Sequence, residues 1–137
     1  MSKGISIIIP CYNEAPKVLH ATVEDVKSAF KSDAAIDYEI LIVNDGSKKY
    51  QYADEFEEAH VSMVHHKVNK GYGAALKTGI THAKHKWIGI TDADGTYPNQ
   101  DFSEFVKHMD EYDMIVGARP WKDISAAINP VRGFPWR

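Results

Sequence analysis

The chain has 137 residues, of which 44% are apolar and 26% are charged, and its net charge is −3. This composition is typical of a soluble globular domain with a real core, and the lack of an overall positive charge argues against a nucleic-acid partner. The single cysteine, Cys11, excludes an internal disulfide framework. No apolar run is long enough to span a bilayer and no signal-peptide pattern is visible, so we expect a cytoplasmic protein.

The first half of the chain alternates strand and helix patterns. Residues 5–10 form an apolar run rich in β-branched residues, which is typical of a strand buried on both faces. A helix is predicted to open at Pro16, because proline is favoured in a first helical turn. A second strand is predicted over residues 37–43, a polar helix over 50–59 and a short third strand over 61–66.

The second half continues the alternation. A glycine-rich loop at 69–73 opens a helix, and we expect its two glycines to serve close helix packing rather than phosphate binding. Residues 86–91 predict a buried strand, 101–109 a helix and 114–117 a fifth strand. The helix after the loop is expected to bury a stripe formed by Tyr72, Ala75, Leu76, Gly79, Ile80 and Ala83.

Strands that alternate with helices predict an α/β fold, a Rossmann-like, doubly wound and mostly parallel sheet. We expect one domain over residues 1–120, followed by a tail over 121–137 that contains Pro and Trp and is truncated or irregular. Polar clusters follow the predicted strands, and the carboxyl ends of such strands share one crevice. These clusters are Tyr12/Asn13/Glu14, Asn44/Asp45/Ser47, Asp92/Asp94 and Arg119.

Asp92 and Asp94 stand one residue apart where the strand over 86–91 ends. Two carboxylates this close repel each other unless positive charge lies near them, and Mg²⁺ or Mn²⁺ prefers such oxygen ligands. An isolated Asp-x-Asp is more often a solvated turn, so the neighbouring motifs must decide between the two interpretations. The seven histidines lack a zinc-like ligand set.

Five motifs, in order over roughly residues 5–119, resemble family 2 glycosyltransferases of the GT-A fold. The match is to the branch of dolichol-phosphate mannosyltransferases and polyprenol-phosphate glycosyltransferases. The motifs are IIIPCYNE at 7–14, IVNDGS at 42–47, NKGYGAA at 69–75, DAD at 92–94 and VGAR at 116–119. Where this family often has an Asp-Asp pair, the chain has Asn44-Asp45.

The resemblance implies an inverting, metal-dependent transferase that uses a UDP- or GDP-sugar as donor. The acceptor it implies is a polyprenyl or dolichyl phosphate, reached by peripheral association with the cytoplasmic face of a membrane. Asp94 and Asp92 would be the catalytic metal ligands for Mg²⁺ or Mn²⁺, with Asp92 alternatively on the ribose. The remaining donor contacts would come from Pro10, Tyr12, Glu14, Asp45, Ala93 and Arg119.

Other interpretations stay open. Tyr12 could be a helix-cap aromatic, Asp45 a turn cap and Arg119 a surface residue. Family members continue well past this length, so a truncated, non-catalytic interaction module is the main alternative, and an uncovered sheet edge would then favour homo-oligomers. A haloacid-dehalogenase-like phosphatase with Asp92 as nucleophile is a remote alternative, because the later Lys and acidic ligands of that family are missing.

Overall fold

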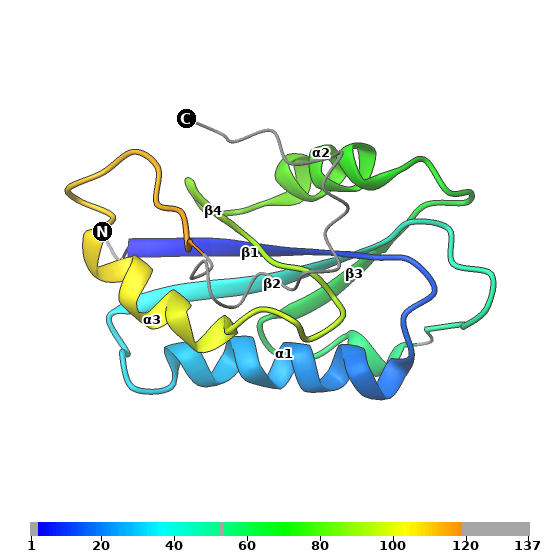
Figure 1. The fold of residues 1–137 in the computed structure, drawn as a ribbon, viewed down its shortest axis with the longest axis horizontal. Coiled ribbons are helices and arrows are strands. Elements are labelled where there is room, and N and C mark those ends of the chain that lie inside the picture. The colour runs from blue at the N-terminus through cyan, green and yellow to red at the C-terminus, as the bar shows by residue number, and fades with distance from the viewer. Residues whose placement is uncertain (1–2, 53, 119–137) are drawn as a thin grey trace, which may run out of the picture.

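A computed structural model describes residues 3–52 and 54–118 (Figure 1). At its centre is a four-stranded parallel sheet with the strand order β3-β2-β1-β4. Four of the five predicted strands are confirmed, each within two residues at either end. They are β1 (Lys3–Cys11), β2 (Ile36–Asn44), β3 (Val61–His65) and β4 (Trp87–Ile90). The strand predicted over 86–91 was expected to be buried, but it lies at the edge of the described sheet and its Ile90 side chain is exposed.

Helices cover both faces of the sheet, so the predicted doubly wound α/β architecture is confirmed. α1 (Pro16–Phe30) and α3 (Phe102–Phe105) pack on one face, and α2 (Tyr72–His82) packs on the other (Figure 1). The chain proceeds from β1 outward to β2 and β3, then returns to place β4 on the other side of β1. The boundary between β1 and β4 is therefore the point where the strand order reverses, which is where ligands bind in open α/β sheets.

The larger apolar core lies beneath α1. Leu19, Val23 and Val26 recur at helical spacing and are almost completely buried against β1 and β2. Burying each such side chain contributes about 1.5–3 kcal/mol relative to leaving it in water. Pro16 occupies the first turn of α1, as predicted. This packing fixes the loop that joins β1 to α1, which carries Tyr12 and Glu14.

α2 approaches the opposite face of the sheet more closely, because a glycine faces β1. A Cβ added at Gly79 would lie 2.5 Å from Cγ2 of Ile8, a fully buried side chain of β1. Ala75, one turn earlier, is also fully buried. Gly79 therefore sets the distance between α2 and the sheet.

Gly79→Ala is expected to lower the free energy of unfolding by about 1–3 kcal/mol, because overpacking against Ile8 outweighs the gain in helix propensity. Urea denaturation followed by circular dichroism measures the change. Thr81→Ala, at an exposed position of α2, is the control and should stay within about 0.5 kcal/mol of the parent chain. A Gly79→Ala chain more stable than the parent would show that α2 packs less closely than described.

Three expectations about local structure were wrong. Residues 50–59 form no α-helix in their described part. They contain a 3-10 turn, η1 (Asp54–Phe56), and an isolated bridge from Glu58 to Val61, and the Tyr52 hydroxyl donates a hydrogen bond to the Glu14 carbonyl. Residues 114–118 form no strand in the described structure, and the Met114 side chain is 79% exposed. Tyr72 and Ile80 of α2 are exposed rather than buried.

The helix predicted over 101–109 consists of three short pieces. They are η2 (Asn99–Asp101), α3 and η3 (Val106–His108). No helix among the described residues has the length and apolarity needed to cross a membrane. Arg119 and the predicted tail over 121–137 lie outside the described residues, so the predicted domain boundary stays a prediction.

Candidate functional site

The loops after β1, β2 and β4 meet at one edge of the sheet, as the sequence predicts. The Asp45 amide donates to the Cys11 carbonyl over 2.8 Å, and the Thr91 amide donates to the Ile8 carbonyl over 3.2 Å. These bonds bring the segment of Asp45 and the segment of Asp92 to the two sides of β1. Parallel pairing thus assembles the polar loops at the strand-order reversal.

Asn13 fixes the loop after β1 against the loop after β2. Its backbone has a φ of 54°, its amide donates to Ser47 Oγ, and its Oδ1 accepts from the amides of Lys48 and Lys49 at 2.9 Å each. Tyr12, the preceding residue, leaves half of its surface exposed. Its ring is therefore accessible to a planar ligand such as a nucleobase.

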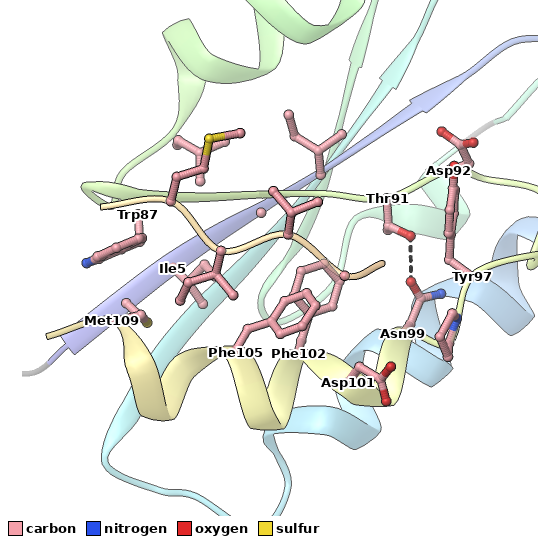
Figure 2. Close-up of a pocket in the computed structure, with 18 of the residues that line it drawn as sticks. Ile5, Trp87, Thr91, Asp92, Tyr97, Asn99, Asp101, Phe102, Phe105 and Met109 are labelled. Carbon is pink, nitrogen blue, oxygen red and sulfur yellow. Dashed lines mark hydrogen bonds between the residues drawn. The ribbon is translucent and has the colours of Figure 1, made fainter. Parts of the chain in front are cut away.

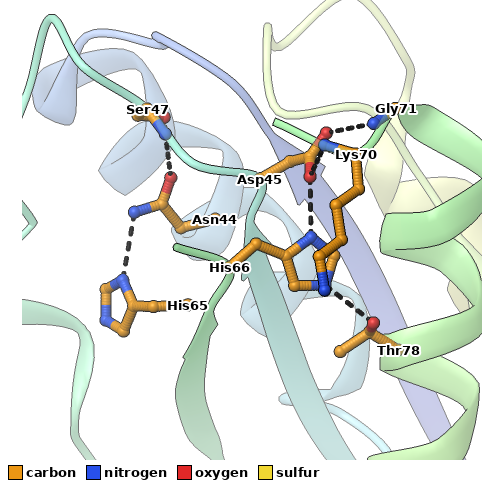
Figure 3. Close-up of polar contacts among 8 residues, drawn as sticks. All are labelled: Asn44, Asp45, Ser47, His65, His66, Lys70, Gly71 and Thr78. Atoms are coloured by element: carbon orange, nitrogen blue, oxygen red, sulfur yellow. Dashed lines mark hydrogen bonds and ion pairs between the residues drawn. The ribbon is translucent and has the colours of Figure 1, made fainter. Parts of the chain in front are cut away.

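Asp45 is buried and engaged by three donors (Figure 3). Oδ1 accepts from His66 Nδ1 at 2.7 Å and from the Lys70 amide at 2.9 Å, and Oδ2 accepts from the Gly71 amide at 2.8 Å. Burial by itself raises the pKa of this carboxyl, but the hydrogen bonds from these three groups outweigh burial and lower the pKa below its ordinary value. Asp45 is therefore an ionised group that holds the loop at 66–71. Its predicted contact with a base or ribose stays a prediction.

Asp45→Asn is expected to lower the free energy of unfolding by about 1.5–3 kcal/mol at pH 7. Each carboxylate oxygen faces a backbone amide, so either orientation of an asparagine places its NH₂ group against an N–H donor. The folded-state pKa lies below the ordinary 3.8. The stabilisation is hence present above pH 3.8 and is lost as the pH falls through the lower folded value. Urea denaturation at pH 7 and at a series of pH values below 3.8 should show the difference between the two chains shrinking as the pH falls, and a constant difference would contradict this role.

The glycine-rich loop does not serve close helix packing, contrary to expectation. A Cβ added at Gly71 or Gly73 meets nothing within 4 Å in the described structure, whereas Gly79 makes the close helix contact. Gly71 instead has a φ of 97°, which turns the chain into α2 directly after its amide reaches Asp45.

Asp92 and Asp94 follow β4 on a short turn. The Tyr72 hydroxyl donates to Asp92 Oδ1 at 3.3 Å, and Asp94 Oδ1 accepts from the amide and the hydroxyl of Thr96. The Ala93 side chain between them is buried, and its carbonyl accepts a hydrogen bond from Thr22 of α1 at 3.0 Å. The turn is therefore anchored to the fold, and these hydrogen bonds engage Oδ1 of both carboxylates.

The donor set fits a hard divalent cation that is completed by a ligand. Carboxylate oxygens are what Mg²⁺ and Mn²⁺ bind, and Mg²⁺ is commonly held by one or two carboxylates together with substrate phosphates. Among residues 3–52 and 54–118 no group of three acidic, His or Cys side chains could hold a metal alone. Asp92 and Asp94 thus suit a metal that arrives with a diphosphate.

An apolar cavity of about 1240 Å³ lies between β4 and α3 and reaches Asp92 at one end (Figure 2). Phe102 and Phe105 line it, and Asn99 accepts a hydrogen bond from the Thr91 hydroxyl at 2.5 Å. The Nδ2 group of Asn99 is buried and has no hydrogen-bond partner among residues 3–52 and 54–118. No sequence pattern indicated this cavity, since its aromatic lining residues Phe102 and Phe105 have the spacing of ordinary core positions in a helix.

Sequence reasoning also missed three residues that hold the site together: Thr22, His66 and Tyr72. The histidine pair at 65–66 suggests only a zinc site, for which the sequence lacks the further ligands, and the helical stripe predicts that Tyr72 is buried. Of the predicted site residues, the structure places Pro10, Tyr12, Glu14, Asp45, Asp92, Ala93 and Asp94 on or beside the carboxyl edge of the sheet.

Comparison with known proteins decides the family. The family described as glycosyl transferase family 2 matches residues 6–133, nearly the whole chain. The chain belongs to glycosyl transferase family 2. This match supports the resemblance seen in the five motifs and gives no support to the phosphatase alternative.

The curated relatives of this family 2 chain are much longer than it is. A dolichyl-phosphate beta-glucosyltransferase, ALG5A of Trichomonas vaginalis, is 31% identical over 95% of this chain and 44% of its own length. The human dolichyl-phosphate beta-glucosyltransferase is 26% identical over 88% and 38%. The putative glycosyltransferase CsbB of Bacillus subtilis is 35% identical over 87% and 37%. The chain therefore spans less than half the length of these relatives.

A solved structure supports the fold of the family 2 domain. The mannosyltransferase PcManGT of Pyrobaculum calidifontis, solved with GDP-Man and Mn²⁺, superimposes with a TM-score of 0.60. The alignment has 24% identity and covers 75% of this chain and 31% of that protein. At this identity the likeness establishes the shared GT-A fold alone.

Proposed function

We propose that this chain is the donor-binding part of a metal-dependent glycosyltransferase that passes a sugar from a nucleotide diphosphate to a polyprenyl phosphate. The observation that carries the proposal is the position of Asp92 and Asp94, at the end of β4 and beside the strand-order reversal. Relatives named as dolichyl-phosphate glucosyltransferases support the acceptor class. The structure solved with GDP-Man and Mn²⁺ supports the donor class.

Asp92 and Asp94 would hold Mg²⁺ or Mn²⁺ through their carboxylate oxygens. A bound divalent cation supplies Lewis-acid stabilisation of the charge that develops on a leaving diphosphate. Thr22 and Thr96 keep the two carboxylates in place, because they bind the Ala93 carbonyl and Asp94 Oδ1 respectively. The pair is thus preorganised by α1 and by its own turn.

The nucleoside would lie over the β1 and β2 loops. Tyr12 offers an exposed ring for stacking on the base, with Pro10 and Glu14 beside it. Asp45 would lie next to the base or ribose together with the loop at 66–71 that it holds. Arg119 would contact the phosphates. The acceptor, already an anionic phosphate, would attack from outside this edge at a membrane surface and need little help from a base.

A thermal-shift panel with UDP, GDP and their sugars, each with Mn²⁺ or with EDTA, tests the proposal. A ligand that binds only the folded state raises its stability by about 2.7 kcal/mol at a concentration of 100 times Kd. We expect one nucleotide series to raise the melting temperature only with Mn²⁺. No shift with either series would contradict donor binding and favour the non-catalytic interaction module.

A further inference from the structure

His66 is a nearly enclosed imidazole at the end of β3. Its side chain is only 6% exposed, and both ring nitrogens have partners (Figure 3). Nδ1 lies 2.7 Å from Asp45 Oδ1, and Nε2 lies 2.7 Å from the Thr78 hydroxyl on α2. The His66 amide also donates to the Asn44 carbonyl of β2. His66 therefore joins β2, β3 and α2.

The direction of these hydrogen bonds follows from the ionised state of Asp45. An ionised carboxylate can only accept, so Nδ1 of His66 carries the proton and donates. Oδ1 then receives both this proton and the Lys70 amide, while Oδ2 receives the Gly71 amide. The imidazole thereby fixes the orientation in which Asp45 binds the loop.

The loop held by Asp45 leads directly to Asp92. Gly46 packs against the backbone of Val68 and Asn69, which presses the loop onto the β2 turn. Gly71 is the N-cap of α2. The hydroxyl of Tyr72, the first helical residue, donates to Asp92 Oδ1. A displacement of the loop would thus change the position of the hydroxyl that orients one of the two aspartates.

We propose that His66 is a positioning residue for the donor site, which holds the Asp45 carboxylate under the Lys70 and Gly71 amides and so sets the contact between Tyr72 and Asp92. Its effect on donor affinity rests on the proposed function, whereas its effect on the loop does not. His66 touches no donor group and acts through Asp45.

Two substitutions of His66 test the contacts of its two ring nitrogens separately. His66→Asn places an amide near the former Nδ1 and keeps a donor for Asp45, whereas His66→Gln reaches toward Thr78 and removes that donor. We expect hydrogen exchange at the Lys70 and Gly71 amides, measured by NMR, to accelerate about tenfold or more in His66→Gln and to stay near the parent rate in His66→Asn. His65→Asn, at the exposed neighbouring histidine, is the control.

The same variants are then titrated with GDP and UDP in the presence of Mn²⁺. His66→Gln should bind about tenfold more weakly than the parent, and His66→Asn should recover most of the affinity. Unchanged amide exchange in His66→Gln, or accelerated exchange with undiminished nucleotide affinity, would overturn the positioning role. A parent chain that binds neither nucleotide would overturn the proposed function instead, and the exchange rates would still decide the role in the loop.

A second variant covers the case in which His66→Gln does not fold. Asp45→Asn keeps the side-chain volume but leaves one of the two loop amides without an acceptor. Faster exchange at either Lys70 or Gly71 would support the same clamp. Parent-like exchange at both amides would contradict it.

Discussion

Replacing Gly46 by alanine is expected to lower the free energy of unfolding by about 3 kcal/mol or more. Gly46 has a φ of +70°, a conformation that costs any other L-residue free energy. An added Cβ would also lie 2.3 Å from the carbonyl carbon of Val68 and 2.4 Å from the amide nitrogen of Asn69. Because both are backbone atoms, the loop that Asp45 holds would have to move.

Two other glycines separate the causes of this effect. Gly71→Ala would introduce backbone strain but no steric clash. The φ of Gly71 is +97°, and nothing lies within 4 Å of its added Cβ in the described structure. Gly73→Ala would introduce neither backbone strain nor a steric clash. The free energy of unfolding should stay the same or rise by about 0.5–1 kcal/mol, because alanine is favoured over glycine in a helix. Urea denaturation should therefore rank Gly46→Ala as the least stable and Gly73→Ala as the most stable. Equal losses at Gly46 and Gly71 would show that the loop does not pack on the β2 turn.

Asp94→Asn is expected to weaken Mn²⁺-dependent nucleotide binding by about 100-fold, while the free energy of unfolding stays within about 0.5 kcal/mol of the parent. The asparagine carbonyl can still accept from Thr96, so the turn after β4 keeps its shape. What is lost is the negative charge and one oxygen offered to the cation. Isothermal titration calorimetry with Mn²⁺ and the nucleotide that binds the parent measures the affinity.

Asp92→Asn should act in the same direction, because its amide oxygen can still accept from Tyr72 but the charge is gone. Asp101→Asn is the matched control, an exposed carboxylate on the lining of the neighbouring cavity that we place in no role. Equal affinities for the parent, Asp94→Asn and Asp92→Asn would remove the basis for a metal site at the end of β4.

The strands and α1 could be predicted because their signals are local. Runs such as Ile7–Ile9 carry β-branched side chains buried on both faces, and α1 combines a proline in its first turn with an apolar stripe. The fifth strand at 114–117 could not be judged locally, since an apolar run becomes a strand only where another strand pairs with it. The same holds for Tyr72, whose spacing places it in the helix stripe but whose ring turns outward to Asp92.

In the candidate site, too, the positions of the loops could be predicted from the sequence, whereas the tertiary contacts of the side chains could not. The rule that polar residues after parallel strands share one edge correctly placed Asp92 and Asp94 near the β1 loop. The contacts of Asp45 were not predictable, because its partners His66, Lys70 and Gly71 lie 21 to 26 residues away in the sequence. A buried carboxylate with three donors is a product of tertiary packing. No spacing in the sequence distinguishes it from a turn cap or a ligand contact.

The most direct test of the account locates the metal itself. In an NMR spectrum of the chain with its preferred nucleotide diphosphate, a small addition of Mn²⁺ should broaden the amide signals of Ala93 and Gly95 first and those of β3, on the far side of the sheet from β4, much later. The broadening should need the nucleotide and should be lost in Asp94→Asn. Broadening centred on His65 and His66, or none near Ala93 at all, would contradict a metal-diphosphate site at Asp92 and Asp94.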